Sequence, residues 1–173
     1  MAFIMCSAKL WRQLNSVEGA RSASAPDHMP DVNLGSWAAK VFTEEGQDLV
    51  LALETRTYLT LLFRFSPGSQ FRANFAAALV HALQDARIPL EVARRESAAI
   101  DVAPLLPLRN RQLTESLNDI EFFCGIEFGY HDDLRTVQRN LNEIPHPNRD
   151  VCVPKEAIKR LFCSEPLRSC TVH

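Results

Sequence analysis

The chain has 173 residues, 46% of them hydrophobic and 23% charged, which is typical of one globular domain and excludes a disordered or fibrous protein. Its 19 basic and 21 acidic residues give a net charge of −2, so no global field draws it to nucleic acid or to an anionic membrane. We expect a single domain over residues 1–162 and a weakly structured tail over residues 163–173.

The first residues predict a strand followed by a helix. Residues 2–8 form an apolar run ended by a lysine, which is typical of a short buried strand, and Leu10, Trp11 and Leu14 then share one side of a helix. Residues 15–33 are rich in small and polar types and predict a mobile loop. The opening run is too short for a signal peptide, and no stretch reaches the roughly 18 apolar residues of a membrane span, so we expect a cytoplasmic bacterial protein without a membrane partner.

The middle of the chain predicts a helix and then a β-hairpin. Apolar residues recur at spacings of three and four over residues 34–42, which favours an amphipathic helix that ends at Gly46. Residues 48–54 and 57–65 are two β-rich runs, and the two residues between them predict a tight antiparallel connection.

A second helix should cover this hairpin. Ser69 can cap a helix that runs to about Arg87 and carries its apolar residues on one face. Residues 90–96 alternate and predict a strand, whereas two prolines make residues 100–108 an extended connection or an edge.

The last third predicts one more strand and three helices. We expect a strand over residues 109–117, a helix over residues 120–128, and a helix over residues 132–144. Residues 151–153 predict a short strand, and Pro154 begins a helix that reaches about Phe162. Together these elements predict an α+β domain with a small antiparallel or mixed sheet and helices packed mainly on one face.

No familiar chemical motif is present. The five cysteines are odd in number and irregularly spaced, which favours reduced thiols, and Cys163, Cys170 and His173 lack the second ligand pair of a zinc site. Phosphate-binding glycine loops and the common hydrolase, kinase and deaminase motifs are absent, and no two histidines have ligand spacing on one element. We therefore expect no metal and no cofactor.

One polar cluster stands out at the predicted strand-to-helix bend, and its members are Asn110, Arg111, Ser116, Asn118 and Asp119. Arg111 can hold a phosphate or carboxylate while Asn118 and the helix start donate further hydrogen bonds. Alternatively, Asn118 or Asp119 caps the helix and Arg111 pairs with Asp119 or Glu115, which needs no ligand.

Several blocks of the sequence also resemble a known family when taken in order: KLWRQL (9–14), LGSWAAKVF (34–42), LVLALETRTYLTLLF (49–63), RIP (87–89) and NRQLTESLND (110–119). They are similar to a bacterial family catalogued only as a domain of unknown function, with LGDWYA-like and NRSVLGSMND-like segments. The resemblance points to Leu34, Gly35, Trp37, Asn110, Arg111, Ser116, Asn118 and Asp119, and it implies no activity. The chain departs from the pattern at Ser36, Ala38 and Glu115.

Two functional hypotheses follow. The first is a non-enzymatic binding protein, an accessory or inhibitory partner linked to mobile-element, defence or toxin–antitoxin systems, with Trp11 or Trp37 exposed for contact. The second is an enzyme or sensor for a phosphate- or carboxylate-bearing ligand that uses Arg111, Asn118 and Asp119. A weaker third is nucleic-acid binding through the arginines Arg94, Arg95, Arg109 and Arg111.

Overall fold

The computed structural model describes residues 2–18, 32–146 and 153–163. Within these ranges the chain forms five strands and six helices: β1 (Phe3–Cys6), α1 (Ala8–Glu18), β2 (Ser36–Glu44), β3 (Gln47–Glu54), β4 (Thr60–Arg64), α2 (Ser69–Asp85), α3 (Leu90–Val102), β5 (Leu105–Pro107), α4 (Arg111–Phe128), α5 (Leu134–Leu141) and α6 (Pro154–Cys163). None of the helices in these ranges is long and apolar enough to cross a membrane.

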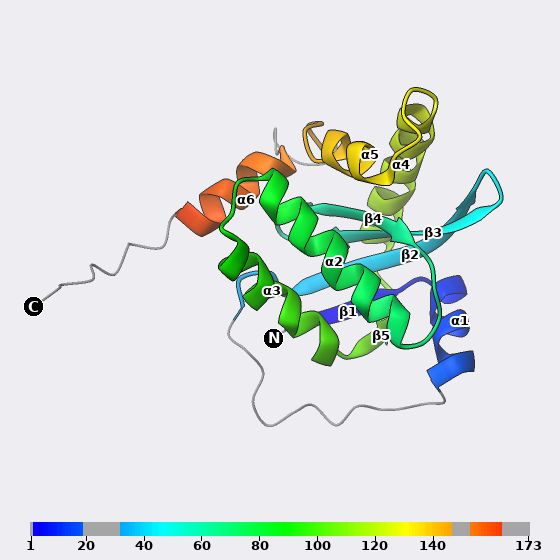
Figure 1. Ribbon diagram of the computed structural model, residues 1–173. Helices are drawn as coiled ribbons and strands as arrows, with labels where there is room; N and C mark the ends of the chain where they lie inside the picture. Colours follow the sequence, from blue (N-terminus) through cyan, green and yellow to red (C-terminus); the bar gives the residue numbers. More distant parts are fainter. Residues whose placement is uncertain (1, 19–31, 147–152, 164–173) are drawn as a thin grey trace, which may run out of the picture.

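The strands form one mixed sheet in the order β4-β3-β2-β1-β5 (Figure 1). The neighbours β2, β3 and β4 run antiparallel, whereas β1 lies parallel to both β2 and β5. The protein is therefore α+β with a mixed sheet, as the sequence predicts, and the predicted hairpin is the β3–β4 pair.

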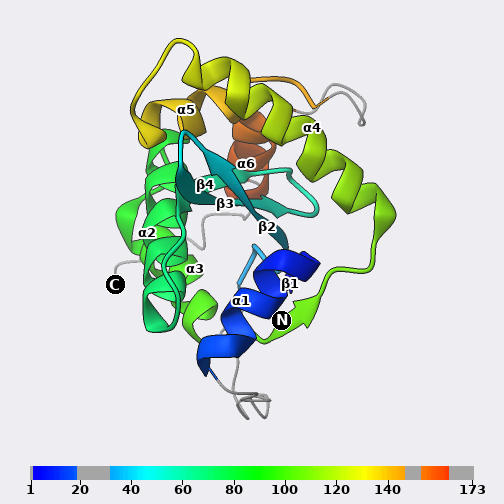
Figure 2. The ribbon, with the colours of Figure 1, turned by 90° about the vertical axis from the view of Figure 1, so that its right-hand side faces the viewer.

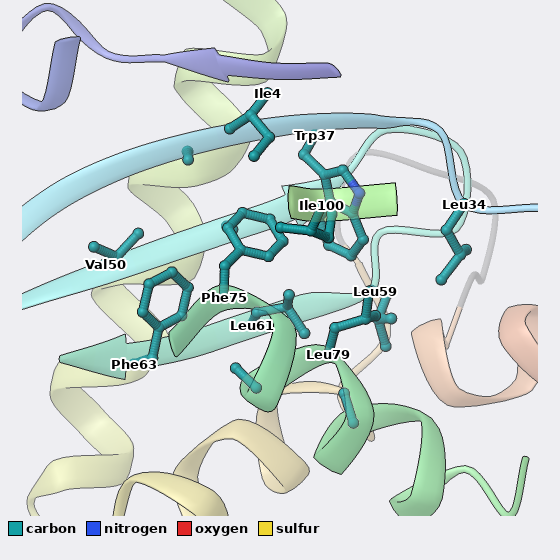
Figure 3. Packing of buried hydrophobic residues seen from close by; sticks show 14 of the residues in the cluster. Ile4, Leu34, Trp37, Val50, Leu59, Leu61, Phe63, Phe75, Leu79 and Ile100 are labelled. Carbon is teal, nitrogen blue, oxygen red and sulfur yellow. The ribbon is translucent and has the colours of Figure 1, made fainter. Parts of the chain in front are cut away.

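Helices cover both faces of this sheet, and Figure 2 shows α2 and α3 on one side and α4 on the other. Because side chains alternate along a strand, the two faces of the sheet belong to two separate hydrophobic cores. The larger core joins the sheet to α1, α2, α3 and α6, and Figure 3 shows Trp37 and Phe75 side by side within it. The smaller core joins the opposite face to α4 and α5.

The predicted helix over residues 34–42 is wrong, because this segment is the strand β2. Trp37 and Val41 face the larger core, whereas Ala38 and Phe42 face the smaller one. A strand that is buried on both faces loses its polar alternation, and its apolar residues then also fit helical spacing. Gly46 lies in the turn to β3 with a positive φ of 78°.

Two further predicted strands are helical. Residues 90–96 open α3, which follows Pro89 and buries Ala93, Ala99 and Ile100. Residues 111–117 open α4, whose buried residues fall three or four apart: Leu113, Ser116, Leu117, Ile120 and Cys124. In both segments the residues alternate in polarity over a short stretch, whereas over the full element the apolar residues follow helical spacing. The predicted extended edge is confirmed in part, since β5 pairs only with β1 at the rim of the sheet.

The remaining predictions hold with smaller changes. Strand β1, helix α1, the apolar stripe of α2, helix α5 and helix α6 form where expected. Helix α1 continues to Glu18, so residues 15–18 are not a loop, while residues 19–31 lie outside the described ranges. Ser69 is the first residue of α2 and not its cap. Residues 151–152 and 164–173, and with them a predicted strand and tail, also lie outside the description.

Candidate functional site

Helix α4 and its N-cap carry all five residues of the predicted polar cluster, yet the first two already have local partners. Asn110 precedes the helix, and its side chain accepts a hydrogen bond from the backbone N–H of Leu113 at 3.1 Å, as an N-cap does. Arg111 is almost fully exposed, and its Nε lies 2.8 Å from a carboxylate oxygen of Glu115 one turn later. The predicted cap at Asn118 or Asp119 is wrong, because Asn110 begins the helix.

The other three residues point in different directions. Ser116 is fully buried, whereas Asn118 is exposed and Asp119 half-buried. The Oδ1 of Asn118 accepts a hydrogen bond of 2.7 Å from Nζ of Lys40 on β2, and this ammonium also pairs with Glu121. The cluster therefore fastens α4 to the sheet and does not converge on a common ligand position.

The two tryptophans predicted to meet a partner are packed inward. Trp37 is fully buried and lies edge-on to Phe75, with ring centroids 5.2 Å apart (Figure 3). Trp11 is half-buried and packs against the same core. Trp37 as a contact residue is therefore wrong, because a side chain inside the core cannot reach a second protein.

Exposed apolar side chains instead gather on the outer face of α4 and its C-terminal turn. Phe122, Ile126 and Tyr130 are 69%, 44% and 80% exposed and follow one another at intervals of four residues. Residues four apart share one side of a helix, so the three side chains form a line, here called the α4 stripe. Gly125 lies beside it, and a Cβ built there meets nothing within 4 Å, so that position is open as well.

The sequence contained a signal for this stripe. Residues 120–130 (IEFFCGIEFGY) hold more large apolar side chains than one helix face can bury. Ile120 and Cys124 take the buried positions of the smaller core, which leaves Phe122 and Ile126 outside. A hydrophobic run that exceeds the buried face is the pattern by which such a surface can be found.

Two buried carboxylates have structural partners. Glu96 on α3 accepts hydrogen bonds of 3.0–3.2 Å from the backbone N–H groups of Asn33 and Leu34 and from the Asn33 side chain. Glu54 accepts hydrogen bonds from the backbone N–H groups of Arg56 and Thr57 at 3.0 and 2.7 Å. These acids hold the entry to β2 and the turn after β3.

The cysteines of the described ranges form no candidate site. Burial raises the pKa of Cys6 and of Cys124 from 9.0 to about 12, so both remain protonated thiols at neutral pH. The described ranges hold no group of three or more His, Cys, Asp or Glu side chains placed to bind a metal. Arg94, like Arg111, lies near a carboxylate of its own helix, at 3.4 Å from Glu91.

A comparison with protein families gives one match. The model of a family described as a domain of unknown function (DUF6933) matches residues 3–157, from β1 into α6, and thus includes the α4 stripe. No curated protein matches the chain.

Proposed function

The chain belongs to the family described as a domain of unknown function, DUF6933, and we propose that it is a non-enzymatic binding protein whose α4 stripe docks a partner protein. The observation that carries this proposal is the exposure of Phe122, Ile126 and Tyr130 along one side of α4 and its C-terminal turn. Large apolar side chains that lie together in water are costly, and such patches mark interaction surfaces.

The chemistry of the stripe suits protein recognition. Aromatic residues are enriched at the centre of protein interfaces, and a tyrosine adds a hydroxyl that can hydrogen-bond at the rim. Polar groups flank the stripe on the N-terminal side, where Asn118 and Glu121 bind Lys40. An apolar centre beside a polar rim is the usual composition of an interface.

The partner that fits this surface presents an apolar groove or helix face. Partners of this kind suit the accessory or inhibitory role in mobile-element, defence or toxin–antitoxin systems that the sequence suggests. The genes beside this one in its genome are the first place to seek the partner.

The proposal is tested by affinity enrichment from a lysate of the native host. The wild-type chain is compared with the double variant Phe122→Ser and Tyr130→Ser, and with a control in which Leu90→Ser and Leu106→Ser remove exposed apolar groups elsewhere. We expect one partner with the wild type and the control, and at least a tenfold loss with the stripe variant, since truncating an aromatic hot spot of an interface costs about 2 kcal/mol or more. The melting temperature of the stripe variant should stay unchanged, because its side chains lie outside the core.

Light scattering detects a second copy of the chain as the partner, and the same stripe variant should then be monomeric. The proposal fails if no protein is enriched and the wild type is monomeric, or if the stripe variant and the control bind equally well.

A further inference from the structure

A groove with basic walls lies away from the α4 stripe, between α2, β4 and α5. It encloses about 360 Å³ and is lined by Leu62, Phe63, Arg64, Ser66, Asn74, Ala77, Ala78, His81, Leu134, Arg135 and Gln138. Figure 1 shows the three elements next to one another on the same side of the molecule. This volume is within the range of small-molecule sites in proteins.

The floor of the groove is fixed by a buried glutamine. The side chain of Gln138 accepts a hydrogen bond from the backbone N–H of Leu62 at 2.8 Å and donates one to the carbonyl of Ala78 at 3.2 Å. One side chain thus ties α5 to both β4 and α2. The space is therefore held open by hydrogen-bonded elements and requires no rearrangement to admit a ligand.

The charge of the lining is one-sided. Arg64 and Arg135 face the groove together with His81, and the lining contains no aspartate or glutamate, although the whole chain carries a net charge of −2. Arg135 lies 3.4 Å from Asp85, and Arg64 has no ion pair with any residue of the described ranges. No ion pair within the described ranges thus neutralises Arg64, although Glu44, Glu45 and Asp132 line a neighbouring hollow that Arg64 also borders.

The edge of the sheet adds a donor. The backbone N–H groups of Thr60 and Leu62 point outward from β4, to the side chains of Asn142, just after α5, and of Gln138 on α5. Because backbone direction alternates along a strand, the N–H of Arg64 points outward on the same side. A backbone N–H beside guanidinium groups is the donor set that binds carboxylate or phosphate oxygens.

We propose that this groove binds a small organic anion, with its carboxylate or phosphate at Arg64 and Arg135 and its apolar body against Phe63, Ala77 and Leu134. This site is independent of the α4 stripe, so either proposal can fail while the other holds.

The test is an NMR titration of the full chain with three probes: phenyl phosphate, benzoate and the neutral benzamide. We expect saturable binding of at least one anion at millimolar concentration, no binding of benzamide, and weaker binding as salt rises. The tighter anion identifies the head group. Arg64→Gln and Arg135→Gln should each weaken binding about tenfold, whereas Arg95→Gln, which removes the same charge from α3, should change it less than twofold.

Each contrary result overturns the site. These results are no saturable binding of either anion, equal binding of benzamide and benzoate, or equal losses in the groove variants and in Arg95→Gln. The spectrum of each variant without probe reports whether it folds, and Arg64→Gln serves alone if loss of the Asp85 pair unfolds Arg135→Gln, because the Arg64 side chain is exposed.

Discussion

Single polar side chains cap the first turns of two helices of this protein, α4 and α5. Asn110 caps α4, and Asp133 caps α5 by accepting hydrogen bonds from the backbone N–H groups of Arg135 and Thr136. The hydrogen bonds from Thr136, first among several, lower the pKa of Asp133, which therefore stays ionised at the positive end of its helix. Both residues satisfy N–H groups that a helix start otherwise leaves to water.

If Asn110 is a helix cap, its replacement should lower the stability of the protein without any ligand present. Asn110→Ala should lower the free energy of unfolding by about 1 kcal/mol, because the N–H of Leu113 loses its acceptor. Gln112→Ala, at an exposed position of the same helix, should leave stability unchanged. Urea unfolding of the two variants measures the difference, and an unchanged midpoint for Asn110→Ala would contradict the assignment.

The two buried thiols predict how stability depends on alkaline pH. Burial raises the pKa of Cys6 and of Cys124 to about 12, against 9.0 in an exposed chain. Below pH 9.0 both states keep the protons, and above it the unfolded chain loses them first, so stability falls as pH rises toward about 12. Each thiol should contribute a slope of about 1 kcal/mol per pH unit.

Urea unfolding between about pH 8 and 10 measures this slope. Because lysines and tyrosines also ionise in alkali, the informative quantity is the difference between variants. Cys6→Ala and Cys124→Ala should each flatten the slope, whereas Cys163→Ala, at an exposed position, should not. Equal slopes in all three variants would show that the buried thiols do not contribute.

Helix α5 protects the outer edge of the sheet. β4 is an edge strand, and a free edge invites pairing with another chain. Asn142, just after α5, accepts a hydrogen bond from the backbone N–H of Thr60 and donates one to the carbonyl of Thr60, both at 2.8 Å. The side chain of Gln138 accepts a hydrogen bond from the backbone N–H of Leu62, two residues further along β4. Two amide side chains thus form hydrogen bonds with backbone groups of β4 that a neighbouring strand would otherwise pair.

This arrangement predicts a large cost for a small change. Asn142→Ala leaves the buried N–H and carbonyl of Thr60 unpaired and should destabilise the protein by about 2 kcal/mol or more, since unsatisfied buried groups cost about 1–3 kcal/mol each. Arg139→Ala, exposed on the same helix, should cost little. Chemical denaturation gives both values, and the Asn142 variant should also aggregate faster because its edge strand opens.

The sequence predicts the type of an element well where one face is buried and the other is exposed to solvent. The apolar stripe of α2, the presence of α5 with aspartates at its start, and the start of α6 at Pro154 follow from spacing, aspartate and proline alone, whereas α5 ends at Leu141, three residues before the predicted end. β2 is buried on both faces, so its sequence lacks the alternation of apolar and polar residues that marks a strand. α4 begins with a charged segment from Arg111 to Leu117, whose alternating pattern is typical of a strand. The predicted site was misplaced for the same reason, since a bend expected at Asn118 is the middle of a helix.

At the scale of the whole molecule, the sheet separates two cores that share their strands. Leu49 and Leu51 of β3 face the core under α4 and α5, while Val50 and Ala52 face the core under α2 and α3. Each strand residue therefore packs on one side while its neighbour packs on the other. Loss of either layer exposes one whole face of the sheet, which couples the two cores energetically.

One buried thiol reports on each core, because Cys6 lies in the larger cluster and Cys124 in the smaller. Labelling with a thiol reagent at increasing urea, followed by peptide mapping, gives the concentration at which each cysteine reacts. If the shared strands make unfolding two-state, both should become reactive at one midpoint, while the exposed Cys163 reacts without urea. A lower midpoint for Cys124 would mean that α4 and α5 detach first and that the layer carrying the α4 stripe opens by itself.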